Sequence, residues 1–200
     1  MAKSVQRLGL KHIVITSVSR DDLPDGGARH FAKTISAIKK ISPGTSTEVL
    51  IPDFRGSPDA IGIVVDACPD VIGHNLETVP RLYGEVRRDA DYARSLDVLA
   101  LIKRLNSKIW TKSGIMLGLG EKEGEVLQVL CDLRRINCDF ITLGQYLQPT
   151  DVHCTVTEYV PPEKFNYFGE IARVLGFIRV LSCPLARSSY RAEEMLRGLK

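Results

Sequence analysis

The stretch that decides the fold is Thr16–Gly27 (TSVSRDDLPDGG), a polar loop between two regular patterns. The apolar run Ile13–Ile15 before it predicts a buried strand, and Ala28–Ile41 after it predicts a helix. In parallel α/β proteins, ligands bind at the carboxyl ends of the strands. Three aspartates and an arginine at such an end, with Asp21 and Asp22 adjacent, predict recognition of a polar, partly cationic ligand.

The same strand, loop and helix order repeats outward from this loop. The patterns predict strands at His12–Val18, Thr47–Pro52, Val71–Asn75, Ile109–Leu117, Asp139–Gly144 and Phe177–Ser182, and helices at Ala28–Ile41, Pro58–Cys68, Tyr92–Leu105, Lys122–Ile136, Pro162–Leu175 and Arg191–Leu199. This alternation predicts a parallel sheet covered by helices, either doubly wound or in a barrel. Met1–Leu10 has the pattern of the back half of a helix, so a barrel starting here would lack its opening strand.

Size and charge indicate an ordinary globular chain. The 200 residues suffice for one sizeable domain, with 44% hydrophobic and 26% charged residues. The net charge of +3 is mild, and no dense run of lysine and arginine occurs, so we expect no nucleic-acid surface.

The five cysteines are scattered, with no CxxC pair. This argues against a disulfide framework and for a reducing compartment. No apolar run reaches transmembrane length, and Met1–Gly9 lacks the apolar core of a signal peptide, so we expect no membrane association. The sequence predicts a cytoplasmic protein, or a mitochondrial or plastid matrix protein if a leader is missing.

Polar groups follow other predicted strands as well. Asn75 and Glu77 can donate to and accept from the hydroxyls of a sugar, or Asn75 can cap a helix, and both interpretations stay open. His74 has no second histidine at ligand spacing, which favours a structural role. Asp53–Gly56 and Gln145–Pro149 are each interpreted first as turns that satisfy their own backbone.

Two further segments admit a functional and a structural interpretation. Lys112–Glu121 carries three glycines that let a flat group approach the backbone or permit tight packing; it is no P-loop, and Met116 is expected in the core. In Arg187–Tyr190, Ser189 precedes a predicted helix and taken alone is best interpreted as its N-cap.

Taken together and in order, these segments become specific. The chain closely resembles the lipoyl synthase family of radical S-adenosylmethionine (SAM) enzymes. The matching segments are Thr16–Phe31 (TSVSRDDLPDGGARHF), Glu48–Gly56 (EVLIPDFRG), His74–Leu82 (HNLETVPRL), Ala90–Leu96 (ADYARSL), Thr111–Glu121 (TKSGIMLGLGE), Gly144–Pro149 (GQYLQP) and Pro184–Tyr190 (PLARSSY).

The resemblance implies a fold and an activity. The fold is a partial (β/α)6 barrel of the TIM type, here one domain over residues 1–200 without its first strand. The enzyme is a sulfurtransferase that inserts two sulfurs at C6 and C8 of an octanoyl group. Its partner is an octanoylated lipoyl carrier domain or the glycine-cleavage H protein. One 4Fe-4S cluster cleaves SAM, and a second cluster donates the sulfur.

The resemblance also implies site residues. Ser189 corresponds to the serine that ligates the second cluster, which replaces the interpretation of Ser189 as a helix cap. The residues implied for cofactor binding are Thr16, Ser17, Asp21, Asp22, Asn75, Glu77, Gly114, Met116, Gly118, Glu121 and Arg187. No catalytic side chain is assigned.

The chain departs from the family in its cysteines. Neither the CxxxCxxC motif of the SAM-cleaving cluster nor the CxxxxCxxxxxC motif of the second cluster occurs. We therefore expect a gene fragment or a late start, inactive as these 200 residues alone. The alternatives are a non-catalytic module that binds SAM or the lipoyl carrier, and one half of a split enzyme.

Overall fold

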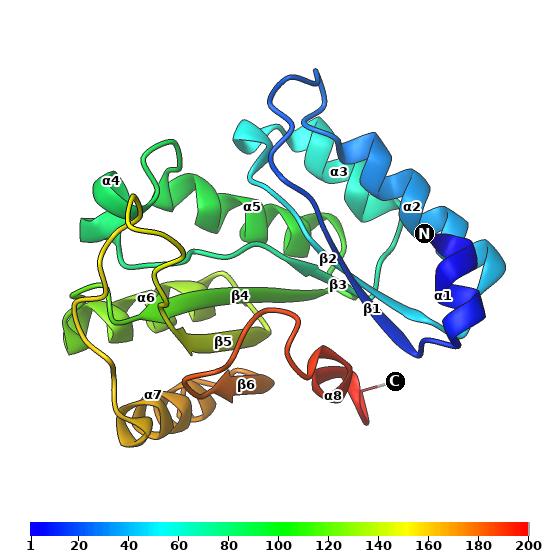
Figure 1. Ribbon diagram of the computed structural model, residues 1–200. Helices are drawn as coiled ribbons and strands as arrows, with labels where there is room; N and C mark the ends of the chain where they lie inside the picture. The colour runs from blue at the N-terminus through cyan, green and yellow to red at the C-terminus, as the bar shows by residue number, and fades with distance from the viewer. Residues whose placement is uncertain (200) are drawn as a thin grey trace.

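A single sheet of six parallel strands organises the chain in the computed structural model, which describes residues 1–199 (Figure 1). The strands are β1 (His12–Thr16), β2 (Ser46–Leu50), β3 (Val71–Gly73), β4 (Trp110–Leu117), β5 (Phe140–Gln145) and β6 (Arg179–Ser182). Their spatial order follows the chain order, which is the arrangement of a barrel and not of a doubly wound sheet. The sheet is not closed, and the described residues pair β1 only with β2.

Helices connect and cover the strands. They are α1 (Ala2–Leu8), α2 (Ala28–Ile41), α3 (Pro58–Asp66), α4 (Tyr83–Val86), α5 (Tyr92–Leu105), α6 (Glu123–Arg135), α7 (Pro162–Val174) and α8 (Ala192–Leu196), with 3-10 turns η1 (Phe54–Gly56) and η2 (Pro80–Leu82). Helices α2, α3, α5, α6 and α7 lie along the outer, convex face of the sheet, and α8 lies inside its curve (Figure 1). In residues 1–199 no helix combines the length and apolarity that crossing a bilayer requires.

The main core lies between the sheet and the convex-face helices. Helix α6 buries Val126, Val129, Leu130 and Leu133, which recur at helical spacing on one side, against outward-facing strand residues such as Ile141. Burial of this kind contributes about 25 cal/mol per Å² of apolar surface. The convex face therefore carries most of the free energy of folding.

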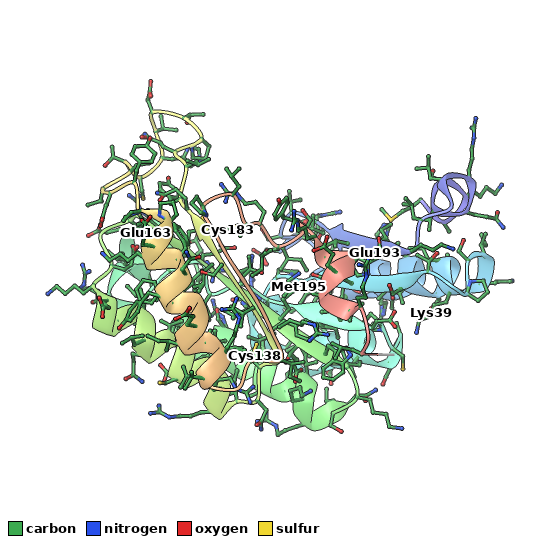
Figure 2. The ribbon with its side chains drawn as sticks, turned by 90° about the horizontal axis from the view of Figure 1, so that it is seen from below. Lys39, Cys138, Glu163, Cys183, Glu193 and Met195 are labelled. Carbon is green, nitrogen blue, oxygen red and sulfur yellow. The ribbon has the colours of Figure 1, made fainter. Side chains whose placement is uncertain are left out.

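A smaller apolar cluster closes the amino ends of the strands on the concave face. Met195 and Leu196 of α8 pack there against Val71 and Phe140, the first residues of β3 and β5. Figure 2 shows Met195 on α8, over this side of the sheet. The carboxyl-terminal segment that precedes α8 is thereby laid across the inside of the sheet.

Several sequence expectations about element ends need correction. The first strand ends at Thr16, two residues before the predicted end, because Ser17–Ser19 have no strand partner among the described residues. The last helix spans only Ala192–Leu196, and its N-cap is Arg191 in a left-handed conformation (φ 50°) with no side-chain cap. Ser189 is therefore not a helix cap. The segments η1, η2 and α4 were not expected from periodicity, because each is too short to show any.

Candidate functional site

A pocket of about 160 Å³ opens at the carboxyl ends of β1, β2 and β3. The polar residues that line it are Thr16, Ser17, His74, Asn75, Glu77 and Arg87. Four of the residues expected to bind cofactor therefore meet in one place, although they come from two strand ends about 60 residues apart in the chain.

Glu77 is the strained member of the pocket. Its φ of 64° is unusual for a side chain other than glycine. The backbone holds this conformation from β4, since the Glu77 N–H donates to Gly114 O at 2.9 Å and Met116 N–H donates to Glu77 O at 2.8 Å. Burial raises the pKa of the Glu77 carboxyl, against the opposing effects of the Asn75 amide and the Arg87 charge. A partly desolvated carboxyl held this way is suited to accept hydrogen bonds from a ligand.

Arg87 was not among the predicted site residues. It stands at the end of α4, where its guanidinium donates to Asn75 O at 3.0 Å and lies 5.4 Å from the centre of the Tyr83 ring. Its position depends on a four-residue helix and on contacts to a strand end. No local pattern in the sequence signals that arrangement.

His74 forms the buried wall of the pocket. It is 2% exposed, and its Nδ1 donates to Ile51 O at 2.9 Å because a carbonyl can only accept. This contact supports the structural role expected of the residue. Its Nε2 is then an acceptor, and no polar atom of residues 1–199 bonds to it. Burial lowers the pKa of His74 to about 4, so the ring is neutral near pH 7.

Asp21 and Asp22 lie outside this pocket. Asp21 is 3.4 Å from Arg55, and Asp22 pairs with Arg20 at 2.7 Å. Both line a separate open hollow beside η1. The structure therefore divides the opening loop: Thr16 and Ser17 face the pocket, whereas the two aspartates neutralise neighbouring arginines.

The glycine-rich segment has a structural part and a part near the pocket. Glu121 accepts the N–H groups of Gly118 (2.5 Å) and Leu119 (2.9 Å), and Gly118 has a φ of 106°. These contacts close the turn after β4. Gly114 instead lies against the pocket residue Asn75, since an added Cβ would be 3.0 Å from Asn75 Oδ1, and Met116 is half-buried against the main core.

The Arg187–Tyr190 segment crosses the concave face, and its two serines point to different surroundings. Ser188 bonds to Asn75, at 2.9 Å between Asn75 Nδ2 and Ser188 Oγ. Ser189 is exposed and lines an open hollow of about 420 Å³ beside β1, together with His12 and Val14. Arg187 is exposed and donates to Ala186 O at 2.6 Å.

The cysteines of residues 1–199 are free and do not assemble into a ligand set. Cys138 is buried, which raises the pKa of its thiol to about 12, and Figure 2 shows it well apart from Cys183. The described part of the chain contains no group of three or more His, Cys, Asp or Glu able to hold a metal ion. The donor set of an iron–sulfur cluster therefore does not fit within these residues.

Comparison with known proteins extends this description. A family model described as the radical SAM superfamily matches residues 1–133. A lipoyl synthase of Caldanaerobacter subterraneus subsp. tengcongensis is 59% identical over 193 residues, which cover 96% of this chain and 68% of that protein. The lipoyl synthase of Geotalea uraniireducens is 56% identical over 194 residues, covering 97% of this chain and 68% of that protein.

Solved structures agree at the level of the fold. HydG, a maturase of the [FeFe]-hydrogenase, superposes with a TM-score of 0.73 over 90% of this chain and 43% of its own, at 13% identity. Methylornithine synthase (PylB) superposes with a TM-score of 0.63 over 99% of this chain and 69% of its own, at 12% identity. From the family model and the identity to its relatives, the chain belongs to the lipoyl synthase family of the radical SAM superfamily.

Proposed function

We propose that these residues supply the SAM-binding wall and one cluster-ligand segment of a lipoyl synthase, which inserts sulfur at C6 and C8 of a protein-bound octanoyl group. The observation that carries the proposal is the pocket that joins Thr16, Ser17, Asn75 and Glu77. Identity of 55–59% to lipoyl synthases supports it.

The pocket groups match the chemistry of SAM. The Glu77 carboxylate and the Asn75 amide can bond ribose hydroxyls or the amino group, and the hydroxyls of Thr16 and Ser17 stand at the rim. Arg87 contributes a positive charge for a carboxylate.

Ser189 is proposed as a ligand of the sulfur-donating cluster. Its exposure on the hollow beside β1 supports this role, because a ligand needs an accessible oxygen. The cysteine ligands of both clusters then come from outside these 200 residues, and the 200 residues alone do not turn over. The proposed partner is an octanoylated lipoyl carrier domain or the glycine-cleavage H protein, and the proposed compartment is the cytoplasm or a mitochondrial or plastid matrix.

Isothermal titration calorimetry of the chain with SAM tests whether the pocket binds SAM. Glu77→Gln should weaken binding about ten-fold, because the amide oxygen that remains accepts hydrogen bonds without the charge of the carboxylate. The matched control is Glu85→Gln, an exposed carboxylate outside the pocket, which should bind like the parent. Equal affinities for both variants would remove Glu77 from the site.

Anaerobic incubation with iron and sulfide tests the ligand claim. We expect no stoichiometric 4Fe-4S absorbance from the chain alone. A stoichiometric cluster would contradict the proposal that the cysteine ligands lie elsewhere.

A further inference from the structure

A buried ion pair on the concave face holds the carboxyl-terminal segment. Lys112 of β4 and Glu48 of β2 have side chains 2% and 3% exposed, and their charged atoms lie 2.8 Å apart. The Lys112 Nζ also donates to the main-chain carbonyl of Ser188 at 2.6 Å. Lysine is rarely buried unless it is paired. Here the ammonium is held by the Glu48 carboxylate and by the Ser188 carbonyl.

The side chain of Ser188 is held as well. Asn75 Nδ2 donates to Ser188 Oγ at 2.9 Å, and Ser188 Oγ lies 3.3 Å from Asn75 Oδ1. Asn75 Nδ2 is also 3.1 Å from Glu77 Oε1. Polar contacts therefore run without a break from Glu77 in the pocket, through Asn75 and Ser188, to Lys112.

The sheet is shaped for this contact. An added Cβ at Gly114 would lie 3.0 Å from Asn75 Oδ1, and one at Gly144 would overlap Ala186 O. Both glycines are on strands, where glycine weakens the strand unless another backbone approaches closely. At Gly144 the approaching group is the backbone of the segment that leads into Ser188, and at Gly114 it is the side chain of Asn75.

We propose that Lys112 and Ser188 are positioning residues for the pocket: Lys112 clamps the Ser188 carbonyl, and Ser188 in turn orients Asn75 toward a ligand beside Glu77. This inference rests on the proposed function for the identity of the ligand, SAM. It gives the two adjacent serines separate roles, since the Ser188 hydroxyl bonds Asn75 of the pocket while Ser189 lines the open hollow beside β1. Because binding linkage is reciprocal, SAM must stabilise the clamped segment as much as the clamp strengthens SAM binding.

Limited trypsin digestion measures the clamp directly. Arg187 and Arg191 are exposed and flank the two serines, so cleavage after them reports release of the segment. Ser188→Ala should speed cleavage about five-fold and weaken SAM binding by a similar factor. Ser182→Ala is the matched control, because the Ser182 hydroxyl of β6 also donates to a carbonyl, that of Phe165 in α7 at 2.6 Å, but Ser182 does not line the pocket. It should change neither quantity by more than about two-fold.

A paired variant separates positioning from folding. Glu48→Leu with Lys112→Met replaces the ion pair by apolar groups, a change that buried pairs often tolerate. We expect a urea midpoint close to that of the parent, cleavage about ten-fold faster at Arg187 and Arg191, and weakened SAM binding. Lys103→Met, which removes a half-buried lysine that is also paired with a carboxylate (Asp139, 2.9 Å), should leave cleavage in the segment unchanged.

The results test two claims separately: that Lys112 holds Ser188 in place, and that the pocket binds SAM. Parent-like cleavage and affinity in both Ser188→Ala and the paired variant would overturn the clamp. A parent chain that binds no SAM would overturn the proposed function and the coupling, while the cleavage rates without ligand would still decide whether Lys112 holds Ser188.

Discussion

On the convex face of the sheet, aliphatic and aromatic side chains from the covering helices fill one continuous core, whereas the middle of the concave face carries Glu48, Lys112 and Ser188. Each methylene buried on the convex face stabilises the folded state. The ion pair on the concave face stabilises the folded state little, because the cost of desolvating the two charges offsets most of their attraction. The difference teaches that one face holds the fold together and the other fixes where a segment lies.

The largest expected effect breaks the convex core. Phe165 of α7 is fully buried, and Phe165→Ala should lower the free energy of unfolding by about 4 kcal/mol through lost burial and a cavity. Urea unfolding followed by circular dichroism measures it. Phe165→Leu should cost less than half as much, and a cost below about 1 kcal/mol for alanine would contradict the packing described for this face.

The next effect comes from the concave face. Glu48→Leu leaves the Lys112 ammonium buried without a carboxylate, which should cost about 3 kcal/mol. Adding Lys112→Met should recover most of that loss, so the two changes are strongly non-additive in urea unfolding. Additive costs would show that the pair is solvated and does not belong to the interior.

Much of the convex face could be predicted from sequence because its signals are local. Apolar periodicity predicted helices at Lys122–Ile136 and Pro162–Leu175, where the structure has α6 and α7. The confirmed α/β fold rests on such patterns, repeated six times. Strand ends were predicted less well because hydrogen bonds to neighbouring strands decide them.

The concave face could not be predicted in this way. Ser188 meets Asn75 across 113 positions and Lys112 across 76, and no periodicity links residues so far apart. One signal was present in the sequence: Glu48 and Lys112 are opposite charges inside two predicted strands, and buried charges need partners. Asp21 and Asp22 were grouped with Thr16 because the family resemblance covers the whole loop, and the structure pairs the two aspartates with arginines.

The pocket wall should impose a pH dependence on stability. The pKa of His74 is lowered to about 4 in the folded chain against about 6.5 when unfolded, so the unfolded chain binds the extra proton between these values. Stability should therefore fall as pH decreases, by about 2 kcal/mol between about pH 7.5 and pH 5.

His74→Asn, which keeps a donor for Ile51 O, removes the titrating ring. Urea unfolding of both proteins across this range should give curves that converge toward acid pH. Parallel curves would mean that His74 is not held neutral by burial.

The smallest effect lies at a helix end on the convex side. The Asp91 carboxylate accepts the Arg94 N–H at 2.7 Å as the N-cap of α5. Asp91→Ala should cost about 1 kcal/mol, and Asp91→Ser should cost less because its hydroxyl can still accept. Since Asp91 contacts neither the pocket nor the carboxyl-terminal segment, SAM affinity and trypsin cleavage after Arg187 should both stay at the parent values. Asp91→Ala should therefore lower the free energy of unfolding without changing cleavage of the carboxyl-terminal segment. The paired Glu48 and Lys112 variant should do the reverse. Together the two variants test whether the convex face sets the stability of the fold while the concave face sets the position of that segment.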